Sequence, residues 1–489
     1  MPELPYLTII IFLPVVGALA VVLQQTTAPG RAIKLTAALF SFLPLVLSFI
    51  LFLAFDSRTT GLQFVEKYPW IPRLGVNYFL AVDGLSLPLV LLTALLGFLA
   101  ILASWKISLR IKEYFAWLLL LETGVLGVFA SLDFLLFFLF WEVELVPMYM
   151  LISIWGSGRK VYSATKFVIY TLTGSAFMLV GLLALYFSTG TFDLVEMSQH
   201  PIPATVLPAT AIFFLIFFAF AVKLPVFPLH TWLPDAHTDA PTAVSVILAG
   251  VLLKMGGYAM IRINLGLFPE VISTYAPLLA TLGVVNVLYG AAVTLLQQDL
   301  KRMIAYSSIS HMGYVLLGIS ALNPVGLTGA ALQMFTHGTI TGLLFLLVGL
   351  VYDKAHTRQI PELGGLSHRM PVIGIVFVVA GLASLGLPTM SGFVAEMLVF
   401  LGTFPVWNVA TVLAAFGIVL TAGYMLWMLQ RSFFGPLNPR HASLADADAL
   451  ERIPLFSLVG VIVIIGVYPA VMTNVIATAI PQLLNRLGG

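Results

Sequence analysis

The chain of 489 residues contains no cysteine, and only 9% of its residues are charged. The absence of cysteine excludes disulfides, thiolate-ligated iron–sulfur clusters and zinc sites built from cysteine. The shortage of charge excludes a soluble enzyme and a nucleic-acid binder, because soluble domains are about one quarter charged. A disordered chain is excluded by the hydrophobic fraction of 60%.

Motifs for bound redox or energy-supplying groups are also missing. No glycine-rich dinucleotide motif follows a predicted strand, there is no ATP-binding loop, and no histidine pair suits a haem. We therefore expect no cofactor and no metal in this chain. Energy for any transport must come from a partner or from another ion gradient.

Long apolar runs dominate what is present, and the mean hydropathy is +1.05. A bilayer core takes roughly 20 apolar residues per helix. The sequence therefore predicts an all-α polytopic membrane protein, one membrane domain over residues 1–489, with about fourteen transmembrane helices. The predicted segments are 5–24, 33–54, 81–104, 113–130, 133–155, 164–187, 209–227, 240–263, 274–297, 301–321, 325–350, 371–402, 407–431 and 454–477.

Basic residues give the predicted orientation. With both termini outside and alternating spans, 16 of the 23 lysines and arginines fall in inside loops, and five, including Arg486, fall outside. This asymmetry fits the positive-inside rule. The two that remain, Lys223 and Lys254, fall within predicted spans.

An internal repeat links two parts of the chain. The pattern at residues 173–182 recurs at 341–350, an offset of 168, and Leu224-Pro225 matches Leu387-Pro388 at an offset of 163. Five helices separate the copies, so the second copy is inverted. We predict inverted five-helix repeats at 113–263 (helices 4–8) and 274–431 (helices 9–13), typical of a transporter.

Two of the predicted helices are broken. Pro225 and Pro228 interrupt the seventh, and Gly386, Pro388 and Gly392 interrupt the twelfth. Irregular backbone at membrane depth is tolerated only where protein or a water-filled cavity covers it. We therefore expect both breaks to lie along the ion path.

Ionisable residues at membrane depth are the candidate functional groups. Each costs from about 3 to more than 10 kcal/mol at the bilayer centre, so each needs a reason. One alternative is structural ion pairing or snorkelling to the interface; the other is a proton relay, which needs groups that hold and release protons. The candidates are Glu122, Glu142, Glu144, Lys223, Lys254, His311, His337 and Glu396.

The two acids of the fifth span cannot share one face, because spacing i, i+2 separates them by about 200°. Pro147 cannot donate to the carbonyl of Val143, which leaves a free acceptor between Glu142 and Glu144. The polar residues after the seventh-helix break are expected to cap and fold a surface loop rather than bind a metal. They are His230, Trp232, Asp235, His237 and Asp239.

Long motifs carry a resemblance over essentially the whole chain. They include Phe-Trp-Glu at 140–142, Lys-Leu-Pro at 223–225 with His-x-Trp-Leu-Pro-Asp-Ala-His at 230–237, Tyr-Ser-Ser-Ile-Ser-His at 306–311 and Ser-Gly-Phe-x-x-Glu at 391–396. The chain resembles the NuoM/NdhD-type antiporter-like membrane subunit of respiratory complex I and its photosynthetic relatives. The resemblance implies an ion pair of Glu142 with Lys223. It also implies a hydrated axis that continues through Lys254, His311 and His337 and ends at Glu396, with Glu122 and Glu144 as lesser candidates.

The resemblance further implies that the chain translocates protons as part of a quinone-reducing complex driven by NADH or ferredoxin. The chain then counts as an enzyme because it is a subunit of that complex. Quinone, iron–sulfur clusters and FMN or NADH are expected in other subunits. Sibling antiporter-like subunits and lipids are the expected partners, without nucleic acid, in a bacterial inner or thylakoid membrane. An Mrp-type cation/proton antiporter subunit is the first alternative, which Glu396 disfavours because siblings usually carry lysine there. A passive structural subunit is the second alternative, which the lysines at membrane depth disfavour.

Overall fold

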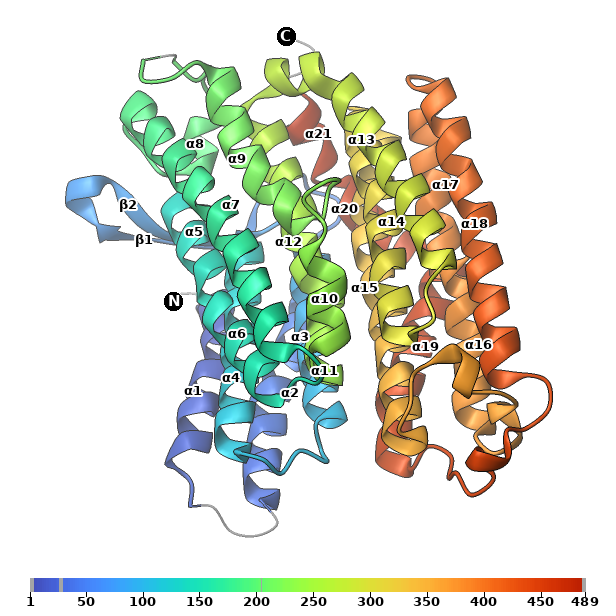
Figure 1. Ribbon diagram of the computed structural model, residues 1–489. Coiled ribbons are helices and arrows are strands. Elements are labelled where there is room, and N and C mark those ends of the chain that lie inside the picture. Colours follow the sequence, from blue (N-terminus) through green and yellow to red (C-terminus); the bar gives the residue numbers. More distant parts are fainter. Residues whose placement is uncertain (1–3, 26–29, 204, 486–489) are drawn as a thin grey trace.

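A computed structural model of the protein describes residues 4–25, 30–203 and 205–485 (Figure 1). Within these residues, ten helices are long and apolar enough to cross a membrane, and four shorter apolar helices of 10–17 residues accompany them. The predicted all-α polytopic membrane fold is confirmed, whereas the count of fourteen spans stays a prediction. The ends Met1 and Gly489 and the basic residue Arg486, used in the orientation, lie outside the described residues.

The elements up to the first break form the left half of Figure 1. They are α1 (Tyr6–Leu23), α2 (Arg31–Ala54), β1 (Gln63–Ile71), η1 (Pro72–Leu74), β2 (Val76–Val82), α3 (Leu87–Ala103), α4 (Ile111–Ala130), α5 (Phe134–Val143), α6 (Leu145–Trp155), α7 (Lys160–Thr189), α8 (Leu194–Met197) and α9 (Ala209–Lys223). α5 and α6 form the predicted fifth span. They are interrupted at Glu144, beside the carbonyl of Val143 that Pro147 cannot bond.

The chain continues beside α9 as far as residue 265 and then crosses to the right half of Figure 1 at residue 269. The elements are α10 (Trp232–Asp239), α11 (Thr242–Ile247), the π-helix η2 (Leu248–Leu252), α12 (Leu253–Ala259), the π-helix η3 (Met260–Leu265), α13 (Pro269–Leu295), α14 (Leu300–Ser320), α15 (Pro324–Ala355), η4 (Ile360–Glu362), η5 (Leu366–His368), α16 (Pro371–Ser384), α17 (Ser391–Thr403), α18 (Asn408–Phe433), η6 (Pro439–His441), α19 (Ala449–Val467), α20 (Ala470–Ala477) and α21 (Ile480–Leu484). The predicted fourteenth span, 454–477, is corrected: α19 ends at Val467, ten residues before the predicted end, and α20 follows after Tyr468-Pro469.

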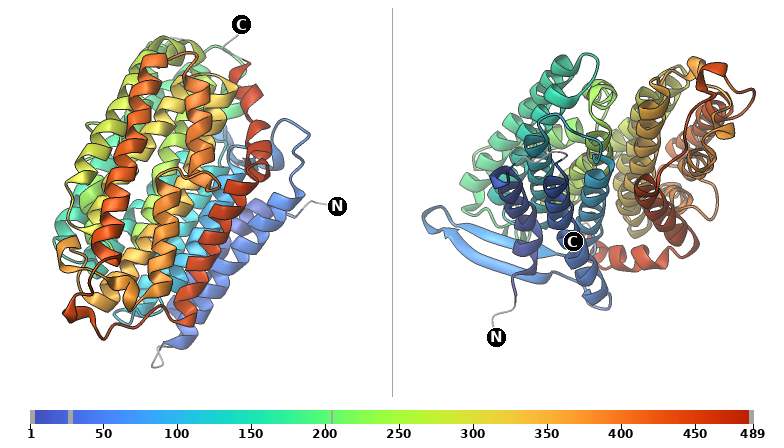
Figure 2. Two further views of the ribbon diagram at one scale, coloured as in Figure 1. Left: turned by 90° about the vertical axis from the view of Figure 1, so that its right-hand side faces the viewer. Right: turned by 90° about the horizontal axis from the view of Figure 1, so that it is seen from below.

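One element was not predicted. β1 and β2 pair as an antiparallel hairpin that projects from the side of the bundle (Figure 2). Its turn ends at Gly75, whose φ of +66° is a conformation that favours glycine. The segment is too short to form a span and too rich in aromatic residues for a solvated loop, and a two-stranded ribbon fits that pattern.

The helices that carry the candidate residues lie at the centre. In the stretch from α11 to η3, the whole apolar window is buried, and in α15 the buried share is 94%. By contrast, large apolar side chains on the outer helices are exposed, among them Leu53, Phe187 and Val419. Such an apolar exterior suits lipid or neighbouring membrane subunits, and the buried centre holds Lys254 and His337.

Both predicted helix breaks are present, and they match each other. α9 ends at Lys223 and α16 ends at Ser384. Three backbone hydrogen bonds recur 161 positions apart: Leu224 N to Phe220 O as Leu385 N to Gly381 O, Val226 N to Ala221 O as Leu387 N to Leu382 O, and Leu229 N to Val226 O as Met390 N to Leu387 O. The backbone of the two breaks therefore aligns at an offset of 161, two residues less than the spacing of 163 between the two Leu-Pro pairs. Gly392 is not part of the second break, because it lies within α17.

Candidate functional site

A buried ion pair lies beside the first break. Lys223, the last residue of α9, pairs with Glu144, where α5 gives way to α6. Lys223 is 1% exposed and Glu144 is fully buried. The Lys223 ammonium also lies 5.4 Å from the ring centroids of both Trp141 and Phe167. Aromatic faces stabilise a desolvated cation, so this pocket is built to hold a charge.

The predicted pair of Lys223 with Glu142 is wrong. The 200° separation of the two acids is right, but the inward position belongs to Glu144. Glu142 is half-buried, and its neighbour Val143 is 42% exposed on the outer side of the helix. Glu142 remains within electrostatic range of Lys223, as the second acid near the pair.

The second cluster starts at Lys254 of α12, which is fully buried. Its Nζ lies 2.7 Å from His337 Nδ1 of α15 and donates to the carbonyl of Ala249. Ala249 belongs to the π-helix η2, where the wider backbone turn places a carbonyl within reach of the lysine. Lys254 and His337 can therefore exchange a proton directly.

The cluster continues to the second break. The rings of His337 and His311 have centroids 5.5 Å apart, and His311 Nδ1 lies 3.3 Å from Glu396 Oε1. The other ring nitrogen of His311 lies 3.4 Å from the hydroxyl of Ser384, the last residue of α16. Glu396 in turn sits against the break, since a Cβ on Gly386 would lie 2.8 Å from its Oε2. The structure thus brings together Lys254, His337, His311 and Glu396.

The two clusters are not joined by any polar contact among the described residues. Between them the break packs directly on α12: a Cβ on Gly256 would lie 2.7 Å from the backbone nitrogen of Leu224. Glu122 lies apart from both clusters. Its Oε2 accepts a hydrogen bond from Ser41 Oγ at 2.7 Å, while Oε1 is buried without a hydrogen-bond partner.

The residues after the first break are not a surface loop, contrary to prediction. His230, Trp232 and His237 are at most 2% exposed. Trp232 donates to the carbonyl of Val222 at 2.9 Å, which satisfies an acceptor at the end of α9. Asp235 and Asp239 fix α10 to α7, through Lys166 at 2.8 Å and Ser163 at 2.6 Å respectively.

His237 is a site residue that the sequence analysis missed. It is fully buried, it stacks on Phe345 with ring centroids 4.6 Å apart, and neither ring nitrogen has a hydrogen-bond partner. Lys254 and Lys301 are the charged groups within electrostatic range of it. Its burial is what distinguishes His237 from a histidine in a surface loop. The residues around it, Leu233, Pro234 and Ala236, show no helical or strand periodicity of apolar residues from which that burial could be inferred.

A cavity of about 510 Å³ opens at the end of the bundle that carries Lys106, Lys301 and Lys354, which we call the basic end. Its lining includes Lys301, whose Nζ donates to the carbonyl of Ala240, and Asp353. The cavity lies between the two halves of the chain, and on its inner side the lining reaches the α10–α11 junction that follows His237. It is therefore a route by which water can approach the buried groups.

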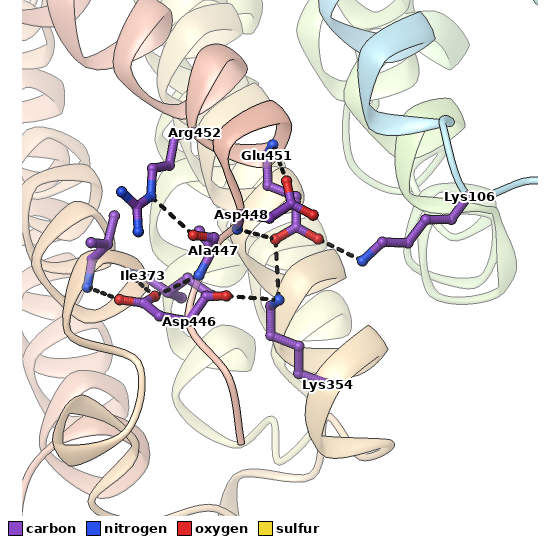
Figure 3. A network of polar contacts seen from close by, with 9 residues as sticks. Lys106, Lys354, Ile373, Asp446, Ala447, Asp448, Glu451 and Arg452 are labelled. Atoms are coloured by element: carbon purple, nitrogen blue, oxygen red, sulfur yellow. Dashed lines mark hydrogen bonds and ion pairs between the residues drawn. The ribbon is translucent and has the colours of Figure 1, made fainter. Parts of the chain in front are cut away.

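An ionic network closes one side of this cavity (Figure 3). Glu451 of α19 bridges Lys106 at 2.6 Å and Lys354 at 3.1 Å. Lys354 also donates to the carbonyl of Asp446, whose carboxylate caps the start of α16. The hydrogen bond from Glu451 raises the pKa of the Lys106 amine, so this pair stays charged at neutral pH.

No group of three or more His, Cys, Asp or Glu side chains in the described part of the chain could hold a metal ion. What the site offers instead is a row of single proton carriers. Lysine, imidazole and carboxylate each gain or lose one proton without moving heavy atoms far. The arrangement is suited to passing protons between Lys254 and Glu396.

The chain is similar to known proteins in both sequence and fold. Residues 131–421 match the family described as NADH:quinone oxidoreductase/Mrp antiporter, TM. The chain is 49% identical to NAD(P)H-quinone oxidoreductase chain 4 1 of Synechococcus elongatus over 97% of this chain and 90% of that protein. A chain of respiratory complex I from Thermus thermophilus has a TM-score of 0.90 at 30% identity and covers 99% of this chain, with 100% of its own length matched. A chain of the Mrp complex from Dietzia sp. shares the fold, with a TM-score of 0.87 at 22% identity, covering 99% of this chain and 98% of that chain.

Proposed function

Because the chain belongs to the NADH:quinone oxidoreductase/Mrp antiporter family of membrane subunits, we propose that it is a proton-translocating, antiporter-like subunit of a complex I-type, quinone-reducing dehydrogenase. The redox chemistry takes place in other subunits, which hold the iron–sulfur clusters and any flavin. The electron donor is NAD(P)H or ferredoxin. This chain contributes the proton path.

The observation that carries the proposal is the buried row Lys254, His337, His311 and Glu396, with contacts of 2.7 Å and 3.3 Å at its two ends. A purely structural bundle gains nothing from these groups, since each charge at membrane depth is costly. A relay needs them, because every member must bind and release a proton.

The ion pair of Lys223 and Glu144 supplies the coupling. When quinone chemistry elsewhere perturbs this pair, the field at Lys254 changes, and one pKa unit corresponds to about 1.4 kcal/mol. Moving one charge across the membrane costs roughly 2.3 kcal/mol per 100 mV. A shift of a few pKa units is therefore large enough to drive a proton outward. Glu142, whose Oε1 is buried near Ser175 of α7, is a second acid within electrostatic range of Lys223 and can respond to the same perturbation.

Proton entry at the basic end and exit near Glu396 complete the path. The cavity with Lys301 leads towards His237, whose unpartnered nitrogens can carry a proton on to Lys254. The matched breaks support inverted repeats at 113–263 and 274–431 within one membrane domain, which would open the two breaks to opposite faces. The basic end then faces the inside, and both termini face the outside.

The expected setting follows from the relatives. Sibling antiporter-like subunits on either side and lipids cover the apolar exterior. The membrane is a bacterial inner membrane or a thylakoid. An Mrp-type cation/proton antiporter subunit is the second candidate, favoured only by the shared fold. Glu396 favours the first candidate.

The test is proton uptake and electron transfer measured together in membrane vesicles that contain the intact complex. Lys223→Ala should leave the complex assembled and lower the number of protons moved per electron. Protons moved by the purified chain without quinone, or sodium exchange that survives removal of the partner subunits, would favour the Mrp-type alternative instead.

A further inference from the structure

The unwound segment between α9 and α10 leaves two backbone groups without partners in either helix, the carbonyl of Pro225 and the N–H of Phe227. One side chain binds both. Asn286 of α13 accepts a hydrogen bond from Phe227 N at 2.7 Å and donates one to Pro225 O at 3.0 Å. Asn286 is fully buried. A buried amide away from water is costly unless both of its ends are bonded, and here both are.

A comparison of the two helix breaks shows why a side chain like Asn286 is needed at the first break and not at the second. The shared backbone hydrogen bonds align the two breaks at an offset of 161, which places Pro388 at the position of Phe227. Proline has no N–H, so the second break presents no donor there. The backbone N–H that Asn286 accepts a hydrogen bond from is therefore present only at the first of the two breaks.

The clamp holds a segment that lies between the two candidate clusters. Lys223 directly precedes it, and Gly256 of α12, two residues after Lys254, packs against its Leu224. Asn286 approaches from the other side, on the first helix of the right-hand half of Figure 1. One turn further along α13, the Tyr289 ring contacts the ring of Phe227 at 5.2 Å.

We infer that Asn286 is a positioning residue for proton transfer, which rests on the proposed function. By holding Pro225 and Phe227, it fixes the end of α9 to α13 and so sets where the Lys223 ammonium stands. A movement of α13 then reaches the ion pair through two hydrogen bonds. Without them, the segment relaxes against α12 and Lys223 is no longer held at its partner.

The test uses the intact complex in vesicles and compares Asn286→Leu with Asn264→Leu. Asn264 is the matched control, a second fully buried asparagine whose amide donates to the Phe213 carbonyl at 3.3 Å, away from the break. Both variants are assayed for assembly, electron transfer, protons per electron, and the pH profile of pumping. The titratable groups that face this region are Lys223, Glu142, Glu144, His230 and Tyr289, with Lys166 and Tyr306 within electrostatic range of the last two.

We expect Asn286→Leu to assemble, to pump fewer protons per electron by about twofold or more, and to shift the pH midpoint of pumping by roughly one unit, the scale of one lost hydrogen bond. Asn286→Asp keeps the acceptor for Phe227 and should be intermediate. Asn264→Leu should keep the wild-type ratio and pH profile. An assembled Asn286→Leu complex with a wild-type ratio and pH profile overturns the inference.

Two further measurements keep the outcomes apart. If Asn286→Leu pumps normally while Lys223→Ala does not, only the role of Asn286 fails; if both pump normally, the proposed function fails. If neither Asn286 variant assembles, hydrogen exchange in the wild-type complex decides. Slow exchange of the Phe227 amide supports the clamp, and exchange as fast as that of an unbonded amide overturns it.

Discussion

Lys223 is paired with Glu144, and Glu142 two residues earlier stands outside the pair. The two acids belong to one helical stretch, and the 200° between them means that only one can enter the pocket formed by Trp141 and Phe167. The pocket is buried, so the lysine depends chiefly on the carboxylate that contacts it, with Glu142 as a second acid within electrostatic range. The relationship makes the two glutamates experimentally separable.

Glu144→Gln should abolish most coupled pumping while the complex remains assembled. Removing one partner from a buried ion pair costs roughly 3–5 kcal/mol, because the other charge is left uncompensated. Glu142→Gln is the matched variant and should have a clearly smaller effect. Protons per electron in vesicles measure both. A more severe defect in Glu142→Gln than in Glu144→Gln would return the pair to the partner expected from sequence.

Lys254→Arg should pump poorly although the charge is kept. Arginine does not deprotonate in proteins, so it cannot pass a proton to His337 Nδ1, which lies 2.7 Å from the lysine nitrogen. Lys106→Arg is the control, since that lysine is exposed and only holds Glu451. Normal pumping by the Lys254 variant would mean that this lysine acts only as a fixed positive charge and takes no part in proton transfer.

Glu396→Gln should slow proton release with the fold intact. Glutamine keeps a hydrogen-bond acceptor for His311 but cannot carry a proton, while a carboxylate releases protons readily near its reference pKa of about 4. Glu396→Lys, which restores a titratable group, should retain partial function. Glu362→Gln, an exposed acid on the α15–α16 connection, is the control. Wild-type proton translocation per electron in Glu396→Gln would exclude this residue from the path.

Asp83→Asn should lower the free energy of unfolding by roughly 3 kcal/mol at neutral pH, through loss of a buried pair with Arg262. Burial opposes the charge of Asp83, but Arg262 at 2.7 Å and the Leu85 and Ser86 amides hold the pKa of its carboxyl below the usual value. The contribution of a lowered carboxyl pKa is present above the unfolded pKa and is lost as pH falls through the folded one.

The difference between wild type and Asp83→Asn should therefore be equal at pH 7 and pH 5 and shrink only below about pH 4. Thermal unfolding of the complex at each pH measures it. Asp56→Asn, an exposed acid on the same side of the bundle, should change stability by at most about 0.5 kcal/mol. A difference that already disappears between pH 7 and pH 5 contradicts the lowered pKa.

The sequence by itself determined the membrane fold and the two broken helices, and it singled out most residues of the proposed relay. Hydropathy decides burial in a bilayer, proline decides where a helix stops, and a charge at membrane depth is too costly to be accidental. That reasoning located Lys223, Lys254, His311, His337 and Glu396 before any contact was known. The sequence is sufficient for these predictions because hydropathy, proline positions and charge at membrane depth can each be read from neighbouring residues in the chain.

Only the tertiary structure decided which groups meet. The choice between Glu144 and Glu142 depends on the rotation of one helix about its axis, which a uniformly apolar span leaves unmarked, since an amphipathic stripe is absent. The burial of His237 and the clamp by Asn286 depend on which helices pack across the break. Such contacts join residues about 60 or more positions apart, and their energies come from packing that no local pattern records.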